Sequence, residues 1–203
     1  MKKIIIAIDS FKGCLTSAEA GKAAEKGIKS INPSCHTSVI PIADGGEGLL
    51  DVLIRATKGK YITLSAHGPL MKMAKTHYGL SGNGRTAIIE MAAISGLPLV
   101  PIEQRNPMLT TTFGTGELIK DALNKGCRNF IIGIGGSATN DAGLGMLQAL
   151  GFRFLDKSGH TLGTGGQIME AVANIDTSGI HPALRETHFM VACDVANPFY
   201  GPD

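Results

Sequence analysis

The sequence has little net charge, no clustered cysteines and no long apolar run, and each absence argues against a class of protein. The formal net charge is +2 in 203 residues, so there is no basic stripe of the kind that binds nucleic acid. The apolar run that begins at Ile4 stops at Asp9, short of a signal peptide, and no run approaches the roughly 20 residues of a membrane span. The four cysteines show no CxxC or CxH spacing, which is typical of reduced thiols. We therefore expect a cytoplasmic protein with neither a nucleic-acid nor a membrane partner.

Two signatures of phosphoryl transfer are also absent. The P-loop pattern G-x-x-x-x-G-K-[ST] does not occur, and neither do the HRD and DFG motifs of protein kinases. The six histidines fall in no metal-ligand or triad spacing. A phosphoryl-transfer enzyme with this sequence would lie outside both of those classes.

Strand and helix patterns alternate from the start of the chain, and 43% of the residues are hydrophobic, enough for a real core. Strands are predicted at Lys3–Ile8, buried on both faces, and at Ser38–Ile42. A capping box at Thr16–Glu19 opens the first helix, and Gly48–Ala56 forms the second. Later strands are predicted at Tyr61–Ser65, Ala74–Leu80, Thr86–Met91, Arg128–Gly133 and His188–Cys193, and later helices at Thr115–Asn124 and Asp141–Leu150. The first three of these strands have no long helix between them, which predicts antiparallel pairing, whereas residues 156–182 are expected to be irregular. The class is α/β with a mixed sheet and a second lobe.

The segment Phe130–Asp141 is the most informative one. An apolar run breaks into glycines, which are followed by small hydroxyl residues and then by a helical pattern. Glycines let the backbone approach a ligand closely, and the N–H groups at a helix start favour an anion. Gly135, Gly136 and Ser137 are therefore candidate phosphate contacts. Asn140 is a candidate nucleotide contact, with a helix N-cap as the alternative. Asp141 is a candidate magnesium ligand, and the alternative is a carboxylate placed favourably at the positive end of the helix.

Three more polar clusters follow strands or open helices. Asp9 stands past the first strand, three residues before Lys12; the acid can take a proton or hold a metal, and the lysine can neutralise phosphate. In Asp44-Gly45-Gly46-Glu47-Gly48 two carboxylates stand among three glycines, which suits Mg²⁺ but is also consistent with a turn acid and a helix-dipole acid. In Thr110–Glu117 the candidates are Gly114 and Thr115, with an N-cap at Thr115 as the alternative. Near the end of the chain, Asp194 again follows a strand.

Taken in order, these clusters resemble the bacterial type of the glycerate kinase family, the ATP-dependent kinases of small hydroxy acids. The matching stretches are Asp9–Gly13, Pro41–Gly48, Thr112–Ile119, Gly133–Asp141 and Ala192–Pro198, with departures at Cys14 and Ala142. The resemblance implies a Rossmann-like parallel-sheet lobe plus a second, inserted α/β lobe with a mixed sheet. It also implies phosphorylation of D-glycerate by ATP with Mg²⁺ in a cleft between the lobes, and it favours the 2-hydroxyl over the 3-hydroxyl. Family members are about twice as long, so the fold is expected to be incomplete at the C-terminus, with residues 1–66 as the first part of the Rossmann-like lobe and 67–203 as the second lobe.

These arguments give a set of site residues. Catalytic candidates are Asp194, Asp44, Asp9 and Lys12, with Asp194 and Asp44 as leading base and metal candidates. Nucleotide-binding candidates are Gly45, Gly46, Gly114, Thr115, Gly135, Gly136, Ser137 and Asn140. Magnesium candidates are Asp44, Glu47 and Asp141.

Two alternatives remain open. Gly133-x-Gly135-x-x-Ala138 fits the dinucleotide fingerprint, with Asp156 as the ribose-binding acid, and would indicate an oxidoreductase. Alternatively, the chain keeps the ligand-binding loops of a kinase but lacks groups needed for turnover. Because a parallel strand at 188–193 has no following helix to cover it, we also expect exposed apolar surface, and with it self-association or dependence on a missing second half.

Overall fold

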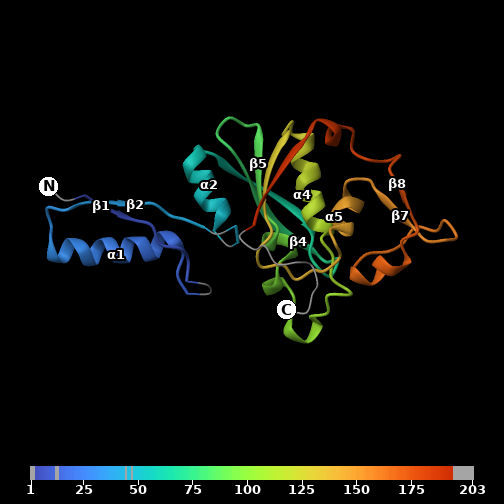
Figure 1. The fold of residues 1–203 in the computed structure, drawn as a ribbon, viewed down its shortest axis with the longest axis horizontal. Coiled ribbons are helices and arrows are strands. Elements are labelled where there is room, and N and C mark those ends of the chain that lie inside the picture. Colours follow the sequence, from blue (N-terminus) through green and yellow to red (C-terminus); the bar gives the residue numbers. More distant parts are fainter. Residues whose placement is uncertain (1–2, 12–13, 44, 47, 194–203) are drawn as a thin grey trace.

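The computed structural model describes residues 3–11, 14–43, 45–46 and 48–193. Strands β1 (Lys3–Ile6) and β2 (His36–Val39) pair in parallel and are joined by helix α1 (Ser17–Ile31). They form a small N-terminal unit that projects away from the rest of the molecule (Figure 1). The capping box is confirmed: the Glu19 N–H donates to Thr16 Oγ1 at 3.2 Å, and the Thr16 N–H donates to Glu19 Oε2 at 2.9 Å.

A five-stranded mixed sheet forms the larger unit, in the order β3-β4-β5-β6-β9. Its strands are β3 (Lys60–His67), β4 (Met73–Leu80), β5 (Thr86–Glu90), β6 (Asn129–Gly133) and β9 (His188–Ala192). The pairs β3–β4 and β4–β5 are antiparallel, whereas β5–β6 and β6–β9 are parallel. The predicted antiparallel pairing and the mixed α/β sheet are thus confirmed.

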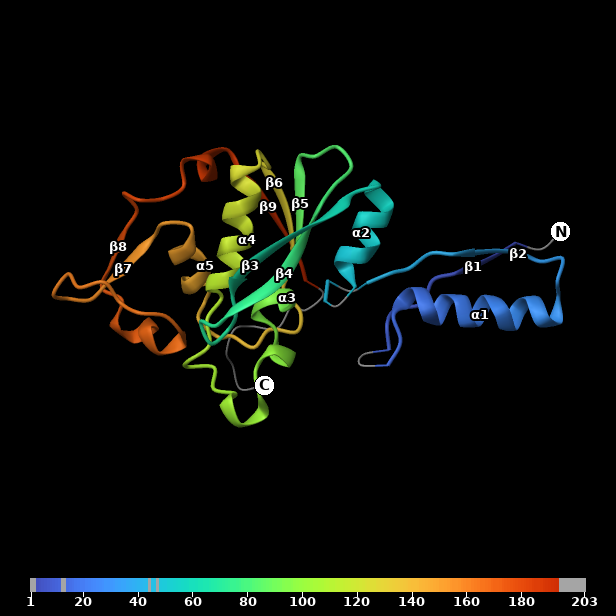
Figure 2. The ribbon, with the colours of Figure 1, turned by 180° about the vertical axis from the view of Figure 1, so that it is seen from behind.

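The sheet is covered differently on its two faces. Helix α2 (Leu49–Thr57) packs Leu50 and Ile54 against Ile88 on one face. On the other face, helix α4 (Phe113–Asn124) and helix α5 (Leu144–Ala149) enclose the main core (Figures 1 and 2). Successive side chains of a strand point to opposite faces of the sheet. Along β5, Ala87 and Ile89 accordingly lie in the main core, whereas Ile88 lies under α2. Because α2 and β3 pack with the later strands, the boundary predicted after residue 66 falls inside this unit.

Short elements complete the described chain. They are α3 (Ala92–Ser95), the antiparallel pair β7 (Arg153–Leu155) and β8 (Asn174–Asp176), and 3-10 helices η1 (Leu97–Leu99), η2 (Ile102–Gln104), η3 (Gly166–Ala171) and η4 (Pro182–Glu186). The prediction that residues 156–182 are irregular is therefore wrong in part. None of the four cysteines forms a disulfide. Within the described residues, no helix has both the length and the apolar character needed to cross a bilayer.

Two strands expose apolar side chains, and on β1 this contradicts the prediction of a strand buried on both faces. Ile5 on β1 is 60% exposed, because β1 pairs only with β2 among the described residues. On β9, Phe189, Met190 and Val191 are all exposed. The expectation of exposed apolar surface at this strand is confirmed.

Candidate functional site

The carboxyl ends of β5, β6 and β9 lie at one edge of the larger sheet. The register pairs Glu90 with Gly133 and Gly133 with Ala192, so the three strands end level with one another. Ligands of open α/β sheets bind at this kind of edge. A ligand-binding site is therefore expected in the loops that follow these strands.

The loop after β2 packs directly onto this edge, and glycines make the approach possible. A Cβ placed on Gly133 would lie 2.5 Å from the Gly45 carbonyl oxygen, and one placed on Gly135 would lie 2.7 Å from Gly46 Cα. A Cβ on Gly45 would meet the Ala192 carbonyl oxygen at 2.7 Å. The structure thus brings together Gly45, Gly46 and Gly135, three residues that the sequence analysis selected from distant motifs.

The segment after β6 turns at Gly135 and Gly136. Gly136 has φ +73°, and its carbonyl accepts the Leu97 N–H at 2.9 Å, which fastens the loop to the start of η1. In the described part of the chain, the N–H groups of Gly135, Gly136 and Ser137 have no hydrogen-bond partner. Successive N–H groups around a residue of positive φ form an anion-binding concavity. The loop therefore has the geometry of a phosphate cradle.

The start of α5 differs from its prediction. The helix begins at Leu144 after Gly143, which has φ +76°, instead of beginning at Asp141. Asn140 is exposed and caps no helix, so its N-cap interpretation is wrong. The glycine at 143 reverses the chain before the helix starts, which separates the cradle from the helix N-terminus.

Asp141 is 1% exposed and holds the starts of two helices together. Its carboxylate accepts the Thr112 N–H at 2.8 Å, the Gly143 N–H at 3.1 Å and the Gly145 N–H at 3.2 Å. It also accepts the hydroxyl hydrogens of Thr111 and Thr112. These five donors occupy the oxygens that a magnesium ion would need, so the observed environment does not fit a metal ligand.

Gly114 and Thr115 lie inside the first turn of α4 and are buried. The Thr115 hydroxyl is 2.9 Å from the Ser95 hydroxyl, and α4 starts after Thr112, so the predicted N-cap at Thr115 is wrong. A Cβ on Gly114 would lie 1.9 Å from the His67 carbonyl oxygen. The glycine therefore allows α4 to touch β3, and neither residue faces open space.

A cavity of about 330 Å³ lies between the N-terminal unit and the α2 side of the sheet. Ser10, Thr16 and Ser17 line it from one unit, and Asp51, Arg55, Tyr61, His77 and Glu90 line it from the other. Ser17 fixes the first wall, because its hydroxyl donates to the Ile8 carbonyl at 2.6 Å and accepts the Ile42 N–H at 3.0 Å. The resemblance leads us to expect a ligand cleft between two lobes, and this cavity is a candidate for it.

Glu90 was missed by the sequence analysis, although it directly follows the apolar residues Ala87–Ile89 as other selected acids follow their strands. Its Oε1 accepts the Leu50 N–H at 2.7 Å, which caps the start of α2. Burial raises the pKa of this carboxyl group, and Asp51 raises it further, while the N–H groups of Leu50 and Gly48 and the charge of His77 oppose the shift. Glu90 is thus the one strand-end acid that the structure places in the cavity among the residues it describes.

Four of the predicted polar site residues, Lys12, Asp44, Glu47 and Asp194, lie outside the described residues. Asp9 is described, and its Oδ1 accepts the N–H of Ser10 at 2.6 Å. Within the described ranges, no group of three or more His, Cys, Asp or Glu side chains could hold a metal ion.

The geometry contradicts the dinucleotide alternative. That fingerprint needs a helix opening directly after the glycine turn, but α5 begins at Leu144, eleven positions after Gly133. Asp156 lies in a separate turn, where its carboxylate accepts the N–H groups of Ser158 and His160. The late start of α5 and the hydrogen bonds that occupy the Asp156 carboxylate remove both supports of that interpretation.

The fold and the edge loops define an α/β protein with a glycine-rich loop at the carboxyl ends of parallel strands and a polar cavity beside it. Comparison with known proteins gives the family. The chain belongs to the glycerate kinase family, whose family model matches residues 4–203.

Several known sequences are similar to it. A glycerate kinase of Bacillus subtilis (strain 168) is 54% identical over 200 residues, covering 98% of this chain and 52% of that protein. A glycerate 2-kinase of Escherichia coli (strain K12) is 49% identical over 199 residues, covering 98% of this chain and 52% of that protein. A crystal structure from Salmonella typhimurium LT2, described as a glycerate kinase 2, superposes with a TM-score of 0.86 at 48% identity and covers 98% of this chain and 54% of that chain. The chain spans about half the length of the curated relatives it matches.

Proposed function

We propose that this chain carries the nucleotide-phosphate loop and part of the acceptor cleft of a kinase that transfers the γ-phosphoryl group of Mg-ATP to D-glycerate. The observation that carries the proposal is the meeting of Gly45, Gly46 and Gly135 at one sheet edge, beside three N–H groups for which the described residues supply no hydrogen-bond partner. The names of its relatives support the reaction, and the Escherichia coli relative, a glycerate 2-kinase, favours the 2-hydroxyl and hence 2-phosphoglycerate.

Phosphoryl transfer depends on positioning and on neutralising charge. The N–H groups of Gly135–Ser137 bind phosphate oxygens, and Lys12 neutralises charge on the transferred group. When bound, Mg²⁺ would neutralise further charge, with Asp44 and Glu47 as its proposed ligands. One acid, with Asp194 and Asp44 as leading candidates and Asp9 next, accepts the proton of the attacking hydroxyl. The hydrogen bonds of Asp141 favour a structural role for that residue over its predicted role in binding magnesium.

A product assay tests this proposal. The chain is incubated with Mg-ATP and a panel of three-carbon hydroxy acids, alone and together with the remaining half of the Bacillus subtilis relative, and the products are identified by NMR. We expect 2-phosphoglycerate from D-glycerate in the mixture and little or none from the chain alone. Absence of any ATP-dependent product in both samples would contradict the kinase proposal, whereas ordinary turnover by the chain alone would contradict only the expected dependence on a second half.

A further inference from the structure

A smaller cavity adjoins the glycine loop after β6. It has a volume of about 220 Å³, and residues of the segments 97–107 and 137–139 line it. Ser137 belongs to both features, because its N–H is one of the three groups of the proposed phosphate cradle and the residue also lines this cavity. The cavity and the cradle are therefore neighbours, and a ligand longer than one phosphoryl group can reach both.

The walls of this cavity are fastened to the loop by hydrogen bonds. The Ala138 N–H donates to the Ser95 carbonyl at 2.9 Å, beside the bond from the Leu97 N–H to the Gly136 carbonyl. From the other segment, the Thr110 hydroxyl donates to the Ala138 carbonyl at 2.7 Å. Contacts within the chain thus preform the cavity.

Arg105 is the one charged side chain among the described residues that line the cavity. Its Nε–H donates to the Val100 carbonyl at 3.2 Å, which holds the guanidinium group at the cavity wall. In the ranges that the structure describes, its two terminal nitrogens have no hydrogen-bond or ion-pair partner. A guanidinium group binds phosphate through two parallel hydrogen bonds. Arg105 therefore supplies a positive charge and available N–H donors beside the cradle.

Two hydroxyl groups line the cavity from the loop. Ser137 Oγ and Thr139 Oγ1 are 2.8 Å apart, and Ser137 Oγ also accepts the Thr139 N–H at 2.9 Å. When Ser137 is the donor between the two hydroxyls, the hydroxyl hydrogen of Thr139 remains for a ligand oxygen. The described lining thus combines a cation with hydroxyl groups and contains no acid, which suits an anion.

We propose that this cavity binds a second phosphoryl group, next to the one held by the cradle, and that Arg105 binds its oxygens. The assignment rests on the proposed function and specifies what the site selects, namely two adjoining phosphoryl groups rather than a single phosphate. The size agrees with this role. Sites for whole drug-sized ligands begin at roughly 300 Å³, so a cavity of about 220 Å³ is suited to part of a ligand.

Ligand titrations of the chain, followed by NMR, test the assignment without turnover. They are made without divalent cations, so that the result does not depend on the proposed magnesium ligands. Inorganic pyrophosphate is compared with inorganic phosphate, and ADP with AMP, at constant low ionic strength. We expect pyrophosphate to bind at least tenfold more tightly than phosphate, and ADP at least tenfold more tightly than AMP, the scale of hydrogen bonds to a charged group.

Variants of Arg105 separate this contact from general charge attraction. Arg105→Gln should remove most of the preference for pyrophosphate and leave phosphate affinity nearly unchanged. Arg85→Gln, at an exposed arginine outside the cavity, lowers the net charge by the same amount and should keep the full preference. Arg105→Lys keeps the charge but not the planar pair of donors, so it should keep only part of the preference. Thermal melts report the folding of each variant.

The proposal is overturned if the unmodified chain binds pyrophosphate no more tightly than phosphate, or if a folded Arg105→Gln or Arg105→Lys keeps the preference shown by Arg85→Gln. An equal loss of affinity for phosphate and pyrophosphate in Arg105→Gln would also overturn it, because damage to the cradle would then explain the loss. These results would leave the kinase proposal standing, because its test is product formation. Conversely, a preference that depends on Arg105 without any ATP-dependent product would keep the phosphoryl subsite and contradict the kinase.

Discussion

At the scale of single residues, Tyr61 shows how one hydrogen bond changes an ionisation. Its hydroxyl donates to Asp51, and this bond, together with burial and the charge of Asp51, raises the pKa of Tyr61 to about 12 from an ordinary value of 10.0. Because the folded pKa is the higher one, the stability from this bond is complete below about pH 10 and is lost as the pH rises toward 12. Ultraviolet titration of tyrosinate should therefore show no group titrating at pH 10 that can be assigned to Tyr61.

Asp51→Asn isolates the cause. This substitution removes the charge beside Tyr61, so the pKa of Tyr61 should fall toward 10, and the difference between the two titration curves should correspond to one tyrosine. Asp156→Asn, in a turn remote from Tyr61, is the control and should leave the curve unchanged. Identical curves for the unmodified chain and Asp51→Asn would contradict the assigned hydrogen bond.

Residue-level expectations held where the partners are close in sequence. The capping box of Thr16 and Glu19 is confirmed, because both partners lie within one helical turn. The N-caps expected at Thr115 and Asn140 are wrong, because more distant parts of the chain determine where those helices begin: Thr115 meets Ser95, twenty residues away. A single sequence carries no signal for such long-range hydroxyl and carboxylate contacts.

At the scale of elements, the buried carboxylate of Asp141 joins the starts of α4 and α5. Asp141→Asn would replace an acceptor oxygen with an amide group facing hydrogen-bond donors, and hydrogen bonds to charged groups contribute about 1.5 to 3 kcal/mol each. We expect this substitution to lower the free energy of unfolding by about 3 kcal/mol, measured by urea denaturation. Asp156 has a more exposed carboxylate, so Asp156→Asn should lower the free energy of unfolding much less. Equal losses would show that the junction does not depend on this carboxylate.

Strand and helix types could be predicted from local patterns, and most ends were placed within two or three residues. The alternation in β5 and the apolar face of α2 carry that information. The register that sets Glu90, Gly133 and Ala192 level could not be predicted, because it depends on the pairing of strands far apart in sequence. For the same reason the role of Gly133 and Gly135 in receiving the 45–46 loop emerges only from the structure.

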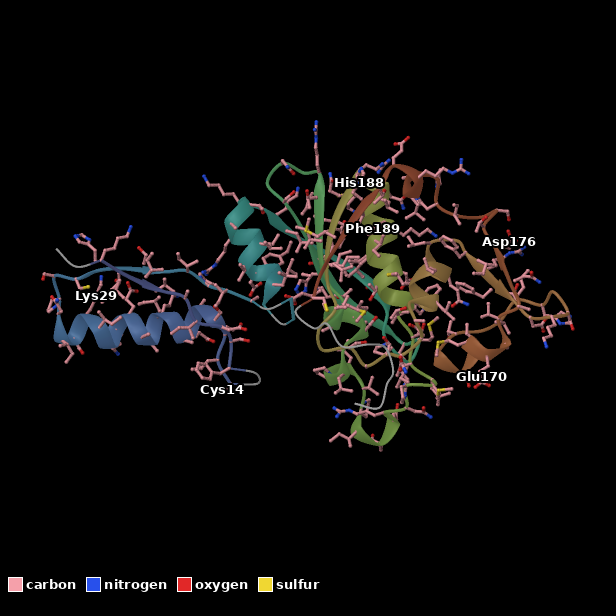
Figure 3. All side chains as sticks on the ribbon, in the orientation of Figure 1. Cys14, Lys29, Glu170, Asp176, His188 and Phe189 are labelled. Carbon is pink, nitrogen blue, oxygen red and sulfur yellow. The ribbon has the colours of Figure 1, made fainter. Side chains whose placement is uncertain are left out.

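At the scale of the whole molecule, the edge strand β9 carries an apolar surface. Met190 is 65% exposed and Val191 54%. Phe189 is labelled in Figure 3. Its ring stacks on that of Phe130, with the ring centroids 5.0 Å apart. Exposed edge strands of this kind promote association between chains. We expect sedimentation to show self-association or aggregation of the purified chain.

A charge on this strand should reduce that association. Met190→Lys places a cation on the edge, a device by which natural edge strands avoid pairing, and should increase the monomer fraction. Met73→Lys, at a methionine of similar exposure on β4, is the matched control and should leave the monomer fraction unchanged. A monodisperse unmodified chain would contradict the expectation that the β9 surface drives association.

The central claim is that the loop around Gly136 binds the phosphates of ATP, and calorimetric titration of ATP into the chain tests it most directly. Gly136→Ala and Gly84→Ala both place a side chain at a residue of positive φ, +73° and +69°. Both substitutions should therefore lower the free energy of unfolding by a similar amount. Only Gly136 belongs to the proposed cradle, where the added Cβ would lie 3.3 Å from Ala92 Cβ. The account predicts that Gly136→Ala weakens ATP binding at least tenfold while Gly84→Ala, of similar stability, binds like the unmodified chain. Equal affinity of both variants for ATP, or binding of NADH in preference to ATP by the unmodified chain, would contradict it.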